Sequence, residues 1–132
     1  MKWLIITGCL LLGTVAVSAK KGSGTLPAGT WGGEHVLLEV SSKGAELEFD
    51  CARGEIPSPI KLDSRRRFDV RGTFSPEHGG PVLRDEKTPM AQARYSGHIS
   101  GDVMSLTVTS GTEKQGPFTL VRGQQPKLRK CR

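Results

Sequence analysis

One stretch decides the fold class of this chain: Ala45-Glu46-Leu47-Glu48-Phe49-Asp50-Cys51, in which apolar and polar residues alternate without a break. A period of two places the apolar side chains on one face and the carboxylates on the other, which is typical of a half-buried β-strand. The same alternation occurs just before it, at Val36, Leu38 and Val40. Because Ser41-Ser42-Lys43-Gly44 separates the two runs, the sequence predicts a β-hairpin.

Alternating runs continue along the chain, each bounded by Gly, Asp, Ser or Pro. Their inward residues are Ile60 and Leu62; Phe68, Val70, Gly72 and Phe74; Ala93, Tyr95, Gly97 and Ile99; Met104, Leu106 and Val108; Phe118 and Leu120. We count seven strands, with residues 124–131 as a candidate eighth, and no helix. An all-β fold follows, and an antiparallel up-and-down β-barrel buries one face of such a meander without unpaired edges. A two-sheet β-sandwich is the alternative.

The N-terminus has the pattern of a signal peptide. Lys2 precedes an apolar run, and Val17-Ser18-Ala19 provides small residues for cleavage after Ala19. The predicted organisation is a signal peptide at 1–19, a flexible Gly/Ser leader at 20–29 and a β-barrel domain at 30–132. A lipoprotein cleavage site at Cys9 is the alternative, which the continuing apolar run from Leu10 disfavours. No other window is long and apolar enough for a transmembrane segment.

Two cysteines, Cys51 and Cys131, remain after cleavage of the predicted signal peptide. An even pair in a small exported domain is normally bridged, so the sequence predicts one disulfide. Closing so long a loop stabilises a domain by roughly 4 kcal/mol in the chain-entropy account. The expected location is therefore secreted or periplasmic.

The chain is basic, with a formal net charge of +6 that falls to +5 when Lys2 is lost. An exported basic protein meets anionic lipid headgroups and polysaccharides before nucleic acid, and aromatic residues for base stacking are not interleaved with its charges. Two basic runs are candidates for a patch that binds an anionic surface: Arg65-Arg66-Arg67, and Lys127, Arg129, Lys130 and Arg132 near the C-terminus. The alternative is a solvated turn and a frayed tail.

Gly29-Thr30-Trp31 stands just ahead of the first alternating run, and Arg122 ends the last one in phase with Leu120. This arrangement resembles the calycin superfamily of lipocalins and avidins, in which a Gly-x-Trp motif opens the barrel. The resemblance implies that Trp31 closes one end of the barrel and packs under Arg122. A guanidinium over an indole is a favourable contact, worth about 1 kcal/mol or more when desolvated.

Two Glu-His pairs flanked by glycine are candidate binding residues: Glu34-His35 and Glu77-His78. In a meander the start of the first strand and the end of the fourth lie at the same barrel end, so the four side chains are expected to converge. Two imidazoles and a carboxylate are able to hold zinc, which makes His35 and His78 alternative metal ligands. Their spacing matches no known metal loop, and polar decoration of turns is the other interpretation.

No nucleophile with a supporting histidine is evident, and Cys51 is better explained as half of a disulfide. The expected interior is bulky and carries no deep polar group to orient a ligand. We therefore predict an exported, non-catalytic binding module without a cofactor, which acts through barrel-end residues and the long segment 76–89 on an unidentified protein or envelope component. The alternatives are a lipocalin-like carrier of small hydrophobic ligands and a metal-dependent enzyme at the barrel end.

Overall fold

The structure is a computed structural model that describes residue 13 and residues 24–77 and 90–131. The predicted signal peptide other than Gly13, the Cys9 alternative, His78 and Arg132 lie outside the described residues. The described residues form ten strands: β1 (Gly24–Thr25), β2 (Gly29–Gly33), β3 (Val36–Val40), β4 (Ala45–Phe49), β5 (Ala52–Ile56), β6 (Lys61–Leu62), β7 (Arg67–Pro76), β8 (Ala91–Ser100), β9 (Val103–Ser110) and β10 (Glu113–Arg122).

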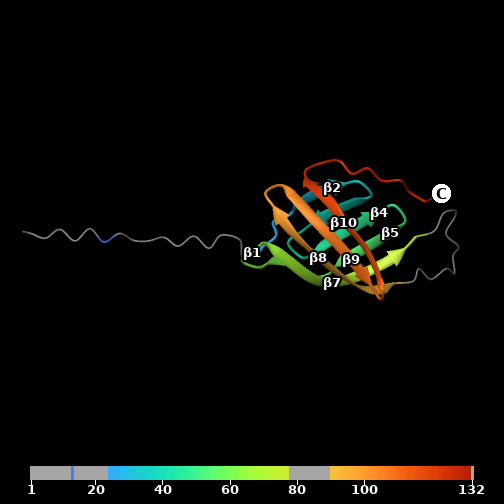
Figure 1. Ribbon diagram of the computed structural model, residues 1–132, viewed down its shortest axis with the longest axis horizontal. Helices are drawn as coiled ribbons and strands as arrows, with labels where there is room; N and C mark the ends of the chain where they lie inside the picture. The colour runs from blue at the N-terminus through green and yellow to red at the C-terminus, as the bar shows by residue number, and fades with distance from the viewer. Residues whose placement is uncertain (1–12, 14–23, 78–89, 132) are drawn as a thin grey trace, which may run out of the picture.

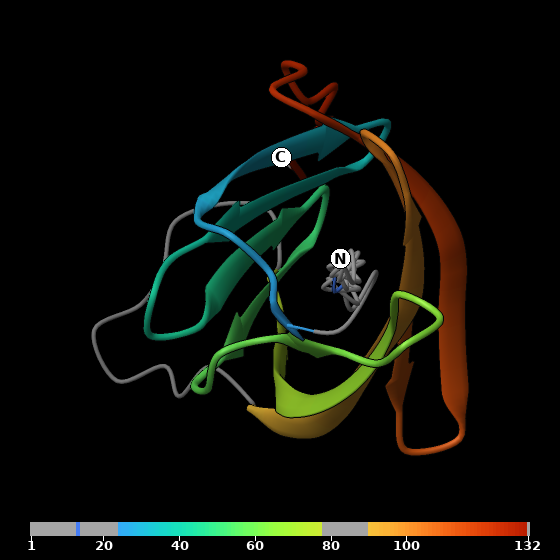
Figure 2. The same ribbon diagram turned by 90° about the vertical axis from the view of Figure 1, so that its left-hand side faces the viewer.

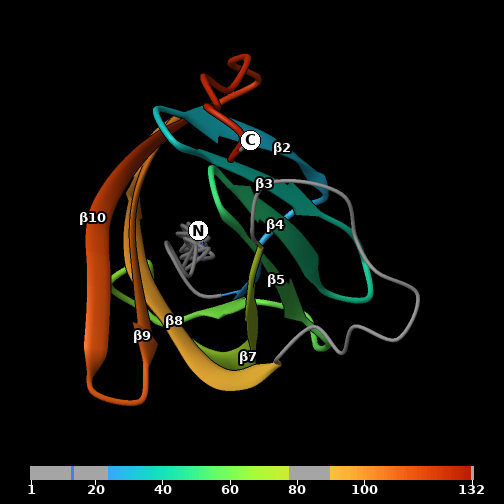
Figure 3. The same ribbon diagram turned by 90° about the vertical axis from the view of Figure 1, so that its right-hand side faces the viewer.

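Eight of these strands form a closed antiparallel barrel in the order β10-β2-β3-β4-β5-β7-β8-β9 (Figure 1). Each strand pairs with the next barrel strand along the chain, and β10 returns to β2, where Arg122 faces Trp31 in register. The ring of strands is seen from its two sides in Figures 2 and 3. The predicted all-β, up-and-down barrel with one disulfide is confirmed, and the sandwich alternative is wrong because closure leaves no edge strand in the main sheet.

The alternating apolar residues fill the interior of the barrel as their period predicts. Within the described residues no buried side chain is polar or charged, apart from the hydroxyl that Tyr95 carries. The largest fully buried side chains are Trp31, Tyr95, Leu26, Leu38, Ile60, Met104, Leu106, Leu120, Val36 and Val108. Apolar burial is the main favourable term in folding, and these residues therefore supply most of the stability of the domain.

Three inward-facing glycines make room for two large rings. The Tyr95 ring lies where side chains at Gly54 and Gly72 would project, and the Phe68 ring lies where one at Gly97 would project. The Tyr95 hydroxyl donates a 2.6 Å hydrogen bond to the carbonyl of Thr73, which satisfies its polar end inside the wall. The rings of large residues thus occupy space that a ligand would need.

The strand assignment from sequence differs from the structure in four places. Strands β2 and β5 were not predicted as barrel strands, because GTWGG and ARGEI place glycine or alanine at inward positions where the alternation is weak. The predicted strand at Ile60 and Leu62 is not part of the barrel, because β6 pairs with β1 instead. The candidate eighth strand, residues 124–131, forms only one isolated bridge, between Glu34 and Lys127.

The small β1–β6 sheet closes one end of the barrel, which we call the closed end (Figure 2). The Leu26 amide donates a 2.8 Å hydrogen bond to the Ile60 carbonyl, and both side chains are buried. The segment 20–29 was expected to be a flexible leader, but its described part from Gly24 onward pairs with β6 and buries Leu26. Leu26 covers apolar surface at the end of the barrel, and the free energy gained by burying it holds this part of the chain in place.

After β10 the chain runs back along the outside of the barrel as residues 123–131, which we call the C-terminal strap. The Gly123 amide donates to the Thr30 carbonyl, and Lys127 exchanges backbone hydrogen bonds with Gly33 and His35. The strap crosses β2 so closely that a side chain at Gly32 would collide with the backbone of Gln124. Glycine is therefore required at Gly32 for the strap to lie flat on β2.

Candidate functional site

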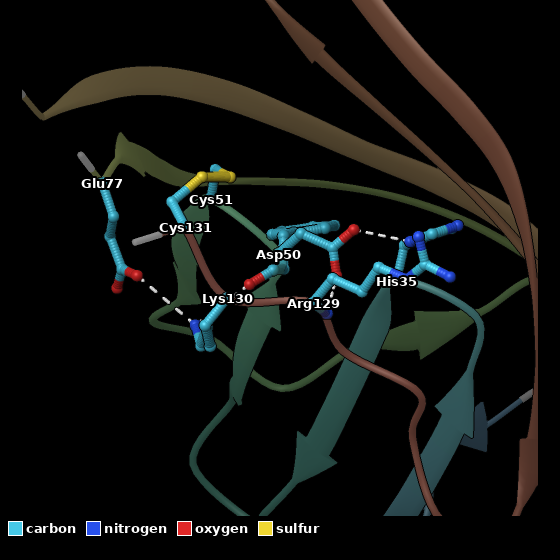
Figure 4. The surroundings of a disulfide bond; sticks show 8 residues. His35, Asp50, Cys51, Glu77, Arg129, Lys130 and Cys131 are labelled. Atoms are coloured by element: carbon cyan, nitrogen blue, oxygen red, sulfur yellow. Dashed lines mark hydrogen bonds and ion pairs between the residues drawn. A yellow bond between two sulfur atoms is a disulfide. The ribbon is translucent and has the colours of Figure 1, made fainter. Parts of the chain in front are cut away.

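The end of the barrel opposite β1 and β6 is the disulfide end, where three segments meet the C-terminal strap (Figure 4). These segments are the β2–β3 turn, the β4–β5 turn and the residue that follows β7, which is Glu77. Cys51 and Cys131 form a disulfide bond there, with a Cα–Cα distance of 5.3 Å. The Glu77 amide donates to the Cys51 carbonyl, so the end of β7 is joined to the same point.

Asp50 is the centre of one hydrogen-bond cluster at this end. Its carboxylate lies 2.5 Å from Nδ1 of His35 and accepts a 2.7 Å hydrogen bond from the Arg129 amide. Partial burial disfavours the charged form of Asp50, but the Arg129 amide and the His35 ring outweigh this effect, and the pKa of Asp50 lies below its usual value. His35 adopts a positive φ of 70°, which turns its ring toward Asp50 and away from the strand.

Lys130 is the centre of a second cluster. Its ammonium donates to the Phe49 carbonyl at 3.0 Å and pairs with Glu48 at 2.9 Å and Glu77 at 3.3 Å. Burial works against its charge, yet the two carboxylates outweigh this effect and raise the pKa of Lys130. Glu77 also pairs with Arg53 at 3.6 Å. These charges neutralise one another, and they hold the strap in place beside the disulfide.

The structure brings Glu34, His35 and Glu77 to the same barrel end, as the meander predicts, but each has a different contact. The Glu34 backbone bridges to Lys127, the His35 ring faces Asp50, and the Glu77 carboxylate faces Lys130 and Arg53. In residues 24–77 and 90–131 no group of three or more His, Cys, Asp or Glu side chains is placed to hold a metal ion. The disulfide and the contacts of Asp50 and Lys130 join the strap to this end of the barrel, and we call this arrangement the clasp.

Trp31 and Arg122 lie as the calycin resemblance implies. The Arg122 guanidinium carbon lies 4.9 Å from the centre of the Trp31 ring, and Trp31 is only 1 % exposed. Arg122 itself is partly exposed and reaches Asp102 in the β8–β9 turn at 4.0 Å. The pair lies where β10 and β2 meet to close the barrel.

The two predicted basic runs do not form one patch. Arg65 and Arg66 lie in the turn before β7 at the closed end, and Arg67 is the first residue of β7. The Asp63 carboxylate accepts hydrogen bonds from the amides of Arg65 and Arg67 at 2.8 Å. Lys127, Arg129 and Lys130 belong to the strap and lie toward the disulfide end. The length of β7 separates the two runs, which lie at opposite ends of the barrel.

A stronger concentration of positive charge lies on the outer surface of β7–β10, which we call the basic face. Its outward side chains alternate with the buried ones, and strand pairing sets Arg71 directly opposite Arg94, and Arg67 directly opposite His98. Across β9, Thr109 links the row of Arg94 to Lys114 on β10. Arg94 pairs with Asp69 at 2.8 Å, whereas Arg67, Arg71 and Lys114 take part in no ion pair with another described residue.

The opposite wall carries the opposite charge. Strand pairing sets Glu39 opposite Glu46, and Glu46 opposite Glu55, so three exposed carboxylates form one row across β3, β4 and β5. Neither face was among the sites predicted from the sequence. The sequence shows the sign of the charge at alternate positions of each run, but only the strand register of the structure shows which of these charges lie side by side.

No known protein family, curated protein or solved structure matches this chain. Its class is therefore set by the fold alone: a closed eight-stranded antiparallel β-barrel, compatible with a calycin-like architecture. Within its described part the chain has no helix that is long and apolar enough to cross a membrane.

Proposed function

We propose that this protein is an exported, non-catalytic binding module that recognises a macromolecular partner through the outer wall of its barrel. The observation that carries the proposal is the division of that wall into a basic face on β7–β10 and an acidic row on β3–β5. Charges of one sign in register oppose folding, since like charges directly across strands are destabilising. Binding of a partner of opposite charge offsets this repulsion.

Export is supported by the predicted signal peptide and by the disulfide between Cys51 and Cys131, which is compatible with an oxidising compartment. Recognition by the barrel-end residues is less favoured than recognition by the wall. At the disulfide end Lys130, Glu77 and Asp50 already have oppositely charged or hydrogen-bonded neighbours. A partner that binds there has to break these contacts first.

The carrier function of the lipocalin type has less support from the interior. The rings of Tyr95 and Phe68 fill the space above Gly54, Gly72 and Gly97, and the interior side chains offer no buried charge to orient a ligand. Ligand sites for small molecules normally combine an apolar cavity with a few placed polar groups. An interior whose described side chains are apolar suits a rigid support for surface recognition better than it suits a carrier.

The proposal is tested by purifying the protein from the medium or periplasm of its source and identifying what it binds. Native mass spectrometry and metal analysis are expected to show the polypeptide without a stoichiometric small ligand or zinc. Immobilised protein is expected to retain envelope material in a salt-dependent manner. A copurifying hydrophobic molecule, bound zinc that is lost in the His35→Ala variant, or turnover of an added substrate would each contradict the binding-module function.

A further inference from the structure

We propose that the basic face binds a linear acidic polysaccharide, a chain of sugars that carries carboxylate or sulfate groups. This inference rests on the proposed binding function and names the partner class for it. The face is formed by the outward residues of β7, β8, β9 and β10, which lie side by side in Figures 1 and 3.

The first argument is the arrangement of the positive charges. Arg71 and Arg94 lie on neighbouring strands in direct register, and Lys114 lies two strands further along the same row. With strands spaced about 4.8 Å apart, the row extends over roughly 14 Å. A single small anion spans only the arginine pair, whereas a linear polymer with repeated charges reaches the whole row. An anion between two arginines also replaces their repulsion by two attractions.

The second argument is the balance of charge on this face. Asp69 is an outward carboxylate on this face, and it forms an ion pair with Arg94 at 2.8 Å. Glu113 adds one further carboxylate, at the first position of β10 beside Lys114. The row of Glu39, Glu46 and Glu55 reaches the edge of this face, where Glu55 lies opposite Thr73 of β7, and its carboxylates repel a polyanion and orient the approach of the protein. Complementary potential of this kind directs association.

The third argument is the chemistry between the charges. Most of the remaining outward residues of the face are small hydroxyl and amide side chains, and His98, Val103 and Val121 are also outward. The hydroxyl and amide residues are Thr73, Ser75, Gln92, Ser96, Ser105, Thr107, Thr109 and Thr119. Hydroxyls donate and accept hydrogen bonds, which suits the hydroxyl and sulfate groups of a sugar chain. Arginine has a planar fork of donors that matches a carboxylate in two-point contact, which gives the polymer orientation as well as affinity.

A shallow hollow of about 570 Å³ lies at the closed-end margin of this face and widens the site. Lys61 and Arg67 line it together with Asp69 and Ser96. Its second carboxylate, Asp63, accepts hydrogen bonds from the backbone amides of Arg65 and Arg67. The hollow therefore combines two cations and a hydroxyl with two carboxylates, so it offers hydrogen-bonding groups to one sugar unit at the margin of the row but adds no net positive charge.

A membrane surface and a nucleic acid fit the face less well. Among the described residues, the exposed large apolar side chains are Met90 and Val103, both outside the charged row, so the row itself presents no apolar anchor for a bilayer. Single-stranded nucleic acid is bound by stacking of bases on exposed aromatic rings. The tyrosine and Trp31 are fully buried here, and the phenylalanines are buried or partly buried against the core.

The test measures binding of the secreted protein to immobilised heparin, polygalacturonate and neutral dextran by biolayer interferometry over a range of salt concentrations. We expect binding to the two acidic polymers, none to dextran, and an affinity that falls steeply with salt because counterions are released. The Arg71→Ser/Arg94→Ser variant is expected to bind about tenfold more weakly, in line with the loss of two charge-assisted contacts.

The matched control is Lys127→Ser/Arg129→Ser, which also removes two positive charges, but from the strap. It is expected to bind the acidic polymers within about twofold of the parent, because screening over about 8 Å limits the influence of distant charges. Equal loss in the control, equal binding to dextran, or no binding to either acidic polymer overturns the inference. Tighter binding to anionic vesicles or DNA than to both polymers overturns it as well.

Failure of this inference is distinguishable from failure of the binding-module proposal. If envelope material is retained by the immobilised protein while both acidic polysaccharides fail, the binding function stands and the partner class is wrong. If a small ligand, bound zinc or turnover is found instead, the binding function itself fails.

Discussion

The disulfide end and the basic face use charge in opposite ways. At the disulfide end Lys130 pairs with Glu48 and Glu77, and these contacts fix the C-terminal strap. On the basic face Arg71 and Arg94 are held opposite each other by the strand register. The ion pairs at the disulfide end stabilise the fold, whereas Arg71 and Arg94 repel each other, a repulsion that the pairing of Arg94 with Asp69 offsets in part. Removing a pair at the disulfide end should therefore lower the free energy of unfolding, and removing Arg71 should raise it.

The largest expected effect is at the disulfide. In the Cys51→Ser/Cys131→Ser variant the free energy of unfolding should fall by roughly 4 kcal/mol, because a closed loop with a sequence separation of 80 residues is opened in the unfolded chain. Urea denaturation followed by Trp31 fluorescence measures this loss. The Lys114→Thr variant is the control and should unfold close to the parent's urea concentration, because Lys114 faces Thr109. Equal stability of the cysteine variant and the parent would contradict the role of the clasp.

The next largest effect concerns the packing of the strap against β2. In Gly32→Val, the added side chain collides with the Gln124 backbone, and overpacking of this kind costs about 1–3 kcal/mol. We expect faster tryptic cleavage after Lys127 and Arg129 in this variant. Gly29→Val is the matched control, because a side chain at Gly29 has open space around it. Identical cleavage rates for the two variants would show that the strap does not need its contact with β2.

Asp50 should have a smaller and pH-dependent effect. Asp50→Ala removes the hydrogen bonds with the Arg129 amide and His35, which should lower the free energy of unfolding by about 1–2 kcal/mol at neutral pH. The pKa of Asp50 is lowered in the folded protein from 3.8, so its carboxylate contributes stability above that pH and loses the contribution as the pH falls further. The difference between parent and variant, measured by urea titration, should therefore shrink below pH 3.8. A constant difference down to the acid unfolding limit would argue against this assignment.

The smallest expected effect has the opposite sign. Replacing Arg71 by threonine removes a like charge opposite Arg94 and should raise the free energy of unfolding by about 0.2–1 kcal/mol at low salt. Lys114→Thr is the comparison variant, because Lys114 faces Thr109 and should change stability less. Thermal unfolding at two salt concentrations separates the cases. A loss of stability in Arg71→Thr would mean that the basic face serves the fold.

The sequence predicts the barrel well where alternation is strong and poorly where the inward residues are small. The run from Ala45 to Phe49 becomes β4 with three buried residues, because its alternation contains Leu and Phe. By contrast, β5 has Gly54 at an inward position, and the reason for this glycine is the Tyr95 ring, which is 41 residues away in sequence. A requirement set by a distant ring leaves no local pattern.

The candidate site shows the same limit. The convergence of Glu34, His35 and Glu77 at one barrel end follows from strand order, which the sequence predicts. The contact between His35 and Asp50 depends on a turn with positive φ, and the contacts of Glu77 depend on a strap that the sequence suggested as a strand. The row of Arg71, Arg94 and Lys114 requires the exact register of four strands, and a shift by one residue would have turned these side chains inward.

The position of the disulfide also determines how the domain responds to a pulling force. The described chain enters the barrel at Gly24 and ends at Cys131, which is bonded to Cys51. Tension applied between the two termini passes through this bond, so β2, β3 and β4 carry the load while β5 to β10 lie inside a covalent loop. At about 3.4 Å per residue, the loop conceals roughly 270 Å of chain. Under tension the oxidised domain therefore extends only through the chain before Cys51, which contains three strands of the barrel, and after reduction its extended length is several times greater.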